Sequence, residues 1–168
     1  MELKNYIRDI VDFPQKGIVF KDITPLLSSP EAFSFVIEDM AKNLVDIDVI
    51  VGLDARGFIF ASALSYALEK PLVLIRKTSK LPYETITEKY SLEYGEASFD
   101  IHTDSIKAGQ KVAIVDDVLA TGGTMGAAIK LVERLGGKVD SLNFLMELSF
   151  LDGKKNISSY SINSLIQY

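Results

Sequence analysis

Apolar residues gather along this chain in short runs, separated by longer segments in which they recur at helical spacing. The short runs are typical of strands buried on both faces of a sheet and lie at 49–53, 72–75, 111–115 and 139–148. Helices are predicted between them, from the turn after residue 53 to about residue 69 and again at 124–135. Strands that alternate with helices in this way predict an α/β fold with a parallel sheet.

A further helix is predicted to begin at Pro30. Ser29 can cap it, proline suits the first helical position, and Glu31 favours the positive end of the helix dipole. Apolar residues then fall on one stripe, formed by Phe33, Val36, Ile37, Met40 and Leu44. Helical spacing also extends over residues 2–11, whereas residues 12–29 are expected to form a structured loop with short extended pieces.

Residues 76–100 depart from the parallel pattern. They are polar, and Tyr90, Leu92 and Tyr94 alternate with polar residues, which predicts a flexible loop together with antiparallel strands. Residues 116–123 are expected to form a loop, and Gly136-Gly137 can end the helix that follows. The short tail after Leu151 carries no diagnostic pattern.

Composition narrows the classes of function. A chain of 168 residues argues for one domain, 1–168, and the absence of cysteine fits a reducing compartment. The net charge is −5 and the basic residues are scattered, which argues against a binder of nucleic acid or of an anionic membrane. No apolar run approaches the ~18 residues that span a bilayer, and the N-terminus is charged where a signal peptide is apolar. We therefore expect a cytoplasmic protein.

The strongest chemical signal is the run from Val115 to Thr124, where an apolar strand leads into two aspartates, a loop of small residues and a helix. Gly122 and Gly123 let the backbone approach a ligand closely, and the helix N-terminus adds its dipole, so the run suits a phosphate. The two carboxylates suit ribose hydroxyls and magnesium-bound water. Paired aspartates often only end a strand and cap a helix, but the whole run favours a sugar-phosphate site. The run lacks the Gly-Lys-Ser/Thr ending of a nucleotide P-loop.

A second polar turn, Asp54-Ala55-Arg56-Gly57, follows the strand at 49–53. Ligands of parallel α/β folds bind beyond the carboxyl ends of the strands, so both polar turns are predicted at that edge of the sheet. By itself, this second turn could equally be a strand-to-helix connection with a surface arginine.

The run from Val115 to Thr124 resembles the phosphoribosyl pyrophosphate (PRPP) signature of the type I phosphoribosyltransferases. Further segments are similar to the branch of that family that acts on adenine, in the order expected there, and the resemblance extends over nearly the whole chain. Lys21 departs slightly, since arginine is common at that position. The segments are Asp12–Pro14, Gly17–Leu27, Gly52–Phe58, Arg76-Lys77, Lys80–Pro82 and Tyr90–Gly95.

The resemblance implies a type I phosphoribosyltransferase fold, a twisted and mainly parallel sheet flanked by helices. A small N-terminal hood (1–29) would cover the base, and 76–100 would contain the flexible catalytic loop. The implied activity is adenine phosphoribosyltransferase, which converts adenine and PRPP to AMP and pyrophosphate in purine salvage. Mg²⁺ is the implied cofactor, held mainly through PRPP and water near Asp116 and Asp117 without a dedicated protein site. The resemblance also implies a homodimer and a strained, sometimes cis, Asp54–Ala55 peptide.

The same resemblance assigns roles to individual residues. Catalysis is assigned to Glu93, as acid or base, and to Arg56, Asp116 and Asp117, while Tyr94 would help to close the loop. Phosphate binding is assigned to Ala120, Thr121, Gly122, Gly123 and Thr124. Pyrophosphate binding is assigned to Asp54, Ala55, Arg56, Lys77 and Lys80, and is supported less for Arg76. Base binding is assigned to Val19, Phe20, Lys21 and Val118, with Phe20 stacked on the purine and Val118 on its opposite face.

Each of these residues also has an ordinary structural interpretation, as a core aromatic, a solvated cation or a surface strand pair. His102, the single histidine, is expected to be structural or solvated. Two other functions remain open. One is a transferase of the same fold that acts on a 6-oxopurine or orotate, and the other is a PRPP-sensing regulator without catalysis. An unrelated sugar-phosphate binder is a weaker alternative.

Overall fold

The computed structural model describes residues 1–91 and 95–168. These residues divide into two compact units, Met1–Asp39 and Met40–Tyr168. We describe each unit by itself, and the single domain remains a prediction.

The first unit contains a short antiparallel hairpin. A 3₁₀ turn, η1 (Leu3–Tyr6), precedes β1 (Arg8–Val11), which pairs with β2 (Val19–Asp22). The helix expected over residues 2–11 is therefore wrong. An isolated helix of that length is marginal in water, whereas the hairpin satisfies the backbone by pairing Ile10 with Phe20 and Val11 with Val19.

Two helices follow the hairpin, α1 (Thr24–Leu27) and α2 (Pro30–Ala41). The predicted start of α2 at Pro30 is confirmed, and the Ser29 hydroxyl accepts the backbone N–H of Ala32 at 3.2 Å. Of the predicted apolar stripe, Val36, Ile37, Met40 and Leu44 are buried, and Phe33 is half-buried.

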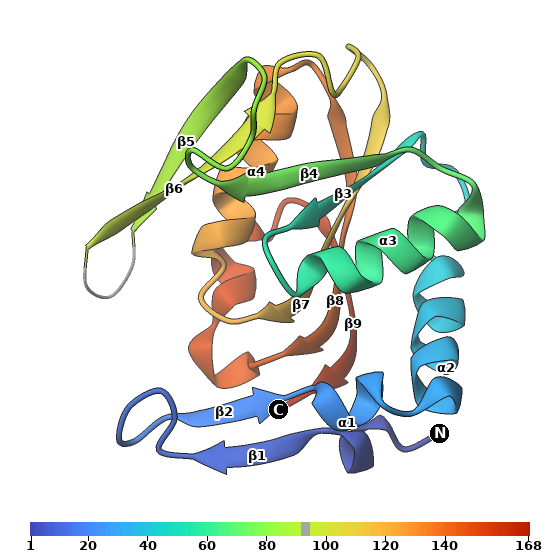
Figure 1. Cartoon of the computed structure of the whole chain (residues 1–168), viewed down its shortest axis with the longest axis vertical. Helices are drawn as coiled ribbons and strands as arrows, with labels where there is room; N and C mark the ends of the chain where they lie inside the picture. The colour runs from blue at the N-terminus through green and yellow to red at the C-terminus, as the bar shows by residue number, and fades with distance from the viewer. Residues whose placement is uncertain (92–94) are drawn as a thin grey trace. The chain divides into compact units, whose positions relative to one another are not determined.

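The second unit is built on a seven-stranded sheet among the described residues, with the order β5-β6-β4-β3-β7-β8-β9 (Figure 1). Strands β4, β3, β7, β8 and β9 are parallel, and β5 and β6 form an antiparallel hairpin at one edge. The mainly parallel α/β sheet is therefore confirmed. The strands are β3 (Val49–Leu53), β4 (Leu72–Lys77), β5 (Thr85–Ser91), β6 (Glu96–His102), β7 (Lys111–Leu119), β8 (Lys138–Glu147) and β9 (Ser161–Gln167).

Helices α3 (Gly57–Leu68) and α4 (Gly123–Arg134) cover opposite faces of this sheet. Successive side chains of a strand point to opposite faces. In β3, Val51 joins the core cluster that contains the buried face of α4. On the other face, a Cβ added at Gly52 would lie only 2.7 Å from the Ala61 Cβ of α3, so this glycine allows α3 to approach closely.

Two further findings differ from the sequence expectation. Strand β7 continues to Leu119 instead of ending at Val115, because Asp116 and Val118 still pair with Phe144 and Met146 of β8. The tail contains 3₁₀ segments η2 (Ser149–Leu151) and η3 (Gly153–Ile157) and strand β9, which extends the sheet at its far edge. Among the described residues, no helix has the length and apolar character needed to cross a membrane.

Candidate active site

The two polar turns lie side by side at the carboxyl ends of β3 and β7, as predicted. These strands are parallel neighbours, with Gly52 opposite Val115. A Cβ added at Gly57 would lie 2.9 Å from Asp116 Oδ1 and 2.9 Å from the Val115 carbonyl oxygen. Only glycine therefore lets the start of α3 rest against the end of β7. The Asp54–Ala55 peptide in this turn is cis, in agreement with the prediction.

Arg56 reaches from the first turn to the second. Its Nε lies 2.7 Å from Asp117 Oδ2, and Asp117 is only 5% exposed. The contact is an ion pair without the alignment of a directed hydrogen bond, since Oδ2 accepts none among the described residues. The guanidinium thus neutralises a buried carboxylate that has spare acceptor capacity.

The paired carboxylates have perturbed acidities. Desolvation raises the pKa of Asp116 well above its usual range, and the neighbouring negative charge of Asp117 raises it further. Burial also raises the pKa of Asp117, although Arg56 opposes that shift. Oδ1 of Asp116 accepts the backbone N–H of Asp117 at 2.9 Å, which fixes the orientation of the Asp116 side chain. The pair is therefore poised to accept donors from a ligand that brings hydroxyl groups.

The predicted phosphate loop leaves β7 and leads into α4. Residues 120–122 form the turn, Gly122 has a φ of +83°, and α4 starts at Gly123. The N-cap residue is Gly122, and among the described residues no side chain caps this helix, so the N–H groups of its first turn have no partner from a cap. Together with the helix dipole, these donors make a binding place for an anion.

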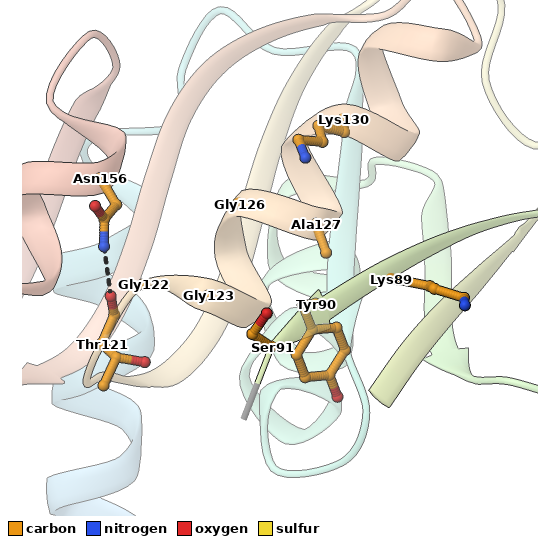
Figure 2. A pocket seen from close by; sticks show the side chains of 10 residues that line it. All are labelled: Lys89, Tyr90, Ser91, Thr121, Gly122, Gly123, Gly126, Ala127, Lys130 and Asn156. Carbon is orange, nitrogen blue, oxygen red and sulfur yellow. Dashed lines mark hydrogen bonds between the residues drawn. The ribbon is translucent and has the colours of Figure 1, made fainter. Parts of the chain in front are cut away.

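A cavity of about 450 Å³ opens beside this loop (Figure 2). The end of β5, the first turns of α4 and η3 form its walls. Its lining combines backbone at three glycines with hydroxyl, amide and ammonium groups: Lys89, Tyr90, Ser91, Thr121, Gly122, Gly123, Gly126, Ala127, Lys130 and Asn156. Such a lining suits a phosphorylated ligand.

A cationic turn follows β4. Lys77 and Lys80 are exposed, and Arg76 Nε lies 3.3 Å from Asp54 Oδ2 in the first polar turn. Arg76 also donates to the Lys80 carbonyl oxygen at 3.4 Å. Arg76, which the resemblance supported less than the lysines, is therefore the cation that connects this turn to Asp54.

Three comparisons with known proteins agree. Residues 27–148 match the phosphoribosyl transferase domain family. Adenine phosphoribosyltransferase of Thermosipho melanesiensis is 57% identical over 170 aligned residues, covering 100% of this chain and 97% of the relative. The chain belongs to the adenine phosphoribosyltransferase family.

Two solved structures of the adenine phosphoribosyltransferase family extend the comparison. The enzyme of Thermoanaerobacter pseudethanolicus is 53% identical with a TM-score of 0.96, over 99% of this chain and 98% of that one. The Saccharomyces cerevisiae enzyme, solved with adenine and an imino-altritol bisphosphate, is 40% identical with a TM-score of 0.90 over 96% and 94% of the chains. The predicted type I phosphoribosyltransferase fold is confirmed.

The segment to which the resemblance assigns base binding forms β2 of the first unit. Val19 is 44% exposed, Phe20 is half-buried with its ring 5.2 Å from that of Phe13, and Lys21 Nζ lies 2.7 Å from Asp9 Oδ1. In the second unit, Val118 is half-buried on β7. Glu93 and Tyr94, the residues assigned to acid–base chemistry and loop closure, lie outside the described residues.

The structure also shows residues beside the cationic turn that the sequence did not identify. Asp100 of β6 is 4% exposed and accepts the Ser79 N–H at 3.0 Å and the Thr87 hydroxyl at 2.7 Å. It thereby holds the turn between Lys77 and Lys80. His102 accepts the Tyr83 N–H at 3.3 Å, in agreement with a structural role. A buried aspartate in a polar strand gave no signal that distinguished it from a surface one.

Proposed function

We propose that this protein transfers the phosphoribosyl group of PRPP to adenine, giving AMP and pyrophosphate in purine salvage. The observation that carries the proposal is the juxtaposition of two loops at one sheet edge. One suits a sugar phosphate, through Asp116, Asp117 and the uncapped start of α4, and the other carries Arg56. The full-length similarity to proteins named adenine phosphoribosyltransferase supports the choice of base.

The proposed roles follow from charge and hydrogen-bonding capacity. Residues 120–124 bind the 5-phosphate through backbone N–H groups and the hydroxyls of Thr121 and Thr124. Asp116 and Asp117 accept hydrogen bonds from the ribose hydroxyls. Arg56, now paired with Asp117, exchanges that partner for the pyrophosphate, which it can bind bidentately together with the cationic turn that contains Lys77 and Lys80.

The reaction forms a bond from a base nitrogen to the anomeric carbon and breaks the bond from that carbon to the pyrophosphate oxygen. Positive charge develops on the ribose, and negative charge develops on the leaving group, where Arg56 stabilises it. The proton lost by the base passes to a group that we assign to Glu93, which the similarity of this segment to the family supports. Exclusion of water from the site would prevent hydrolysis of PRPP.

This arrangement suits a Mg²⁺ ion that is coordinated by PRPP. Among the described residues, no group of three or more His, Cys, Asp or Glu side chains could hold a metal by itself. Two adjacent carboxylates, with Asp117 Oδ2 accepting no hydrogen bond among the described residues, suit the water molecules of a substrate-bound ion. When bound, the ion supplies charge neutralisation to the pyrophosphate. Asp116 and Asp117 would position its hydration shell.

Selectivity for adenine is proposed to come from backbone groups of the β2 segment. Adenine presents an amino donor and an unprotonated ring nitrogen, whereas 6-oxopurines present an acceptor oxygen and a protonated nitrogen. A carbonyl near Val19 and an N–H near Lys21 match the first pattern and oppose the second. Sites of this kind can reject the wrong base by about 10⁴-fold, because buried polar groups are left unpaired.

A homodimer is also proposed. The exposed side of α3 carries Ile59, which is 38% exposed, and Tyr66, which is 89% exposed, and Leu74 of the neighbouring β4 is 37% exposed. Phe60 is fully buried and belongs to the core. Apolar side chains exposed on one element and its neighbour are typical of a surface between subunits. Light scattering should give twice the monomer mass, and a monomer at working concentration would refute the dimer.

The decisive assay incubates the protein with Mg²⁺ and PRPP, and in turn with adenine, hypoxanthine, guanine or orotate, and measures released pyrophosphate. Of these four bases, we expect only adenine to give pyrophosphate release. Comparable release with hypoxanthine or orotate would leave only the broader transferase assignment. If the protein binds PRPP but releases no pyrophosphate with any of these bases, a non-catalytic regulator would be favoured. A cytoplasmic location stays a prediction.

A further inference from the structure

The C-terminal segment η3 lies directly against the phosphate loop. A Cβ added at Gly153 would lie 2.1 Å from the Ala120 carbonyl oxygen and 3.1 Å from the Gly122 nitrogen. A Cβ added at Gly122 would in turn lie 2.6 Å from the Gly153 carbonyl oxygen. The two segments therefore meet backbone to backbone, and a side chain at Gly153 would displace the loop.

A side chain of η3 also holds the loop. The Asn156 amide donates to the Thr121 carbonyl oxygen at 3.1 Å, as Figure 2 shows at the start of the turn into α4. The Thr121 carbonyl and the Gly122 N–H belong to one planar trans peptide and point in opposite directions. Fixing the carbonyl toward Asn156 therefore directs the Gly122 N–H away from Asn156.

The segment itself is firmly anchored. Lys154 Nζ lies 2.6 Å from Glu147 Oε2, at the end of β8, and Ile157 is buried in the core cluster. Farther along, the Tyr160 hydroxyl donates to Glu133 of α4 at 2.6 Å. This hydrogen bond raises the pKa of Tyr160 to about 12. These contacts attach the segment to the sheet and to the helix that the phosphate loop begins.

We infer that Gly153 and Asn156 are positioning residues, which hold the loop of residues 120–124 in the form that binds the substrate phosphate. This inference rests on the proposed function, because it takes that loop as the phosphate site. Gly153 has no side chain that could touch the substrate, and Asn156, although it lines the cavity, donates its amide to the Thr121 carbonyl oxygen. Their effect passes through the peptide groups of Ala120 and Thr121, so it should appear in ligands that carry the phosphate and be absent in ligands that lack it.

The test compares AMP with adenosine by calorimetry and measures the KM for PRPP. Asn156→Ala should weaken AMP binding and raise the KM for PRPP by about 3–10-fold, the effect of losing one hydrogen bond. Its adenosine affinity should be unchanged and its kcat changed less than its KM. Gly153→Ala should have a larger effect in the same direction. If Gly153→Ala fails to fold, Asn156→Ala still decides the question.

Ser158→Ala is the matched control, because Ser158 is exposed and directly follows η3, and it should behave as the wild type. Thr124→Ala tests the proposed function separately. If Thr124→Ala weakens AMP binding and Asn156→Ala does not, the positioning role is refuted while the phosphate loop stands. If neither variant affects AMP more than adenosine, both the loop assignment and the positioning role are refuted. Equal losses for AMP and adenosine with Asn156→Ala would indicate a general structural role and overturn the inference.

Discussion

Replacing Asp116 by asparagine should lower activity and raise stability at the same time. Asparagine has almost the same shape, and its Oδ1 can still accept the Asp117 N–H that Asp116 accepts at 2.9 Å. The substitution therefore removes an ionisable group beside buried Asp117 and leaves the local geometry in place. The loss of a preorganised contact to the reacting sugar should lower kcat/KM by about 10²–10³-fold, or about 2.7–4 kcal/mol of transition-state stabilisation.

The gain in stability has a defined dependence on pH. Because the pKa of Asp116 is raised in the folded protein, the folded state keeps a proton that the unfolded chain releases near pH 4. The contribution of this carboxyl to stability is therefore fully present below about pH 4 and is lost as the pH rises through the folded pKa. Asparagine has no such proton, so the Tm of the variant relative to the wild type should increase from acidic to neutral pH.

Calorimetry from pH 4 to pH 8, with steady-state kinetics on the same preparations, measures both effects. For a chain of 168 residues, each 1 kcal/mol of stabilisation raises Tm by about 2–4 °C. Asp116→Ala is the control, since it removes the acceptor of the Asp117 N–H as well as the charge. A variant with near wild-type turnover would refute the assignment of Asp116 to the site. A Tm that falls at neutral pH would refute the argument from desolvation and charge repulsion.

Three other substitutions test the remaining parts of the site. Arg56→Lys keeps the charge but loses the bidentate geometry, so the KM for PRPP should rise by about tenfold, whereas an unchanged value would show that Arg56 does not bind pyrophosphate. Phe20→Ala should weaken adenine binding by about 5–100-fold in a fluorescence titration without improving hypoxanthine, and equal adenine affinity would exclude stacking. Gly57→Ala places a Cβ 2.9 Å from Asp116 Oδ1, so calorimetry should show a loss of about 1–3 kcal/mol, and an unchanged Tm would contradict the close approach.

The sequence determined the elements whose signal is local. Ser29 and Pro30 set the start of α2, because a cap acts within one turn of the helix. The apolar run at 49–53 is long enough to specify a strand that is buried on both faces. The run from Val115 to Thr124 predicted a strand that leads through glycines into a helix, because these parts are contiguous along the chain, and the proposed sugar-phosphate site is built on that connection.

Local sequence signals did not determine the elements that depend on partners far away along the chain. Residues 2–11 have helical spacing, yet pairing with β2 decides that 8–11 form a strand. Strand β7 extends through Asp116 because β8 continues beside it and pairs with it as far as Leu119. The sequence before Leu119 contains no signal that marks this end of the strand. The tail, which lacks a pattern of its own, supplies β9 because the far edge of the sheet is available to it.

In the candidate site, too, the sequence predicted some features and the tertiary structure decided others. Its residue types could be predicted from sequence, since phosphate, ribose and pyrophosphate each require particular donors and acceptors. Tertiary structure alone decided that Arg56 meets Asp117, that Asp100 holds the turn at Ser79, and that Asn156 reaches Thr121. These pairs are separated by between 21 and 61 positions along the chain. Their contacts arise from strand order and helix packing, and strand order and packing are properties of the folded chain as a whole.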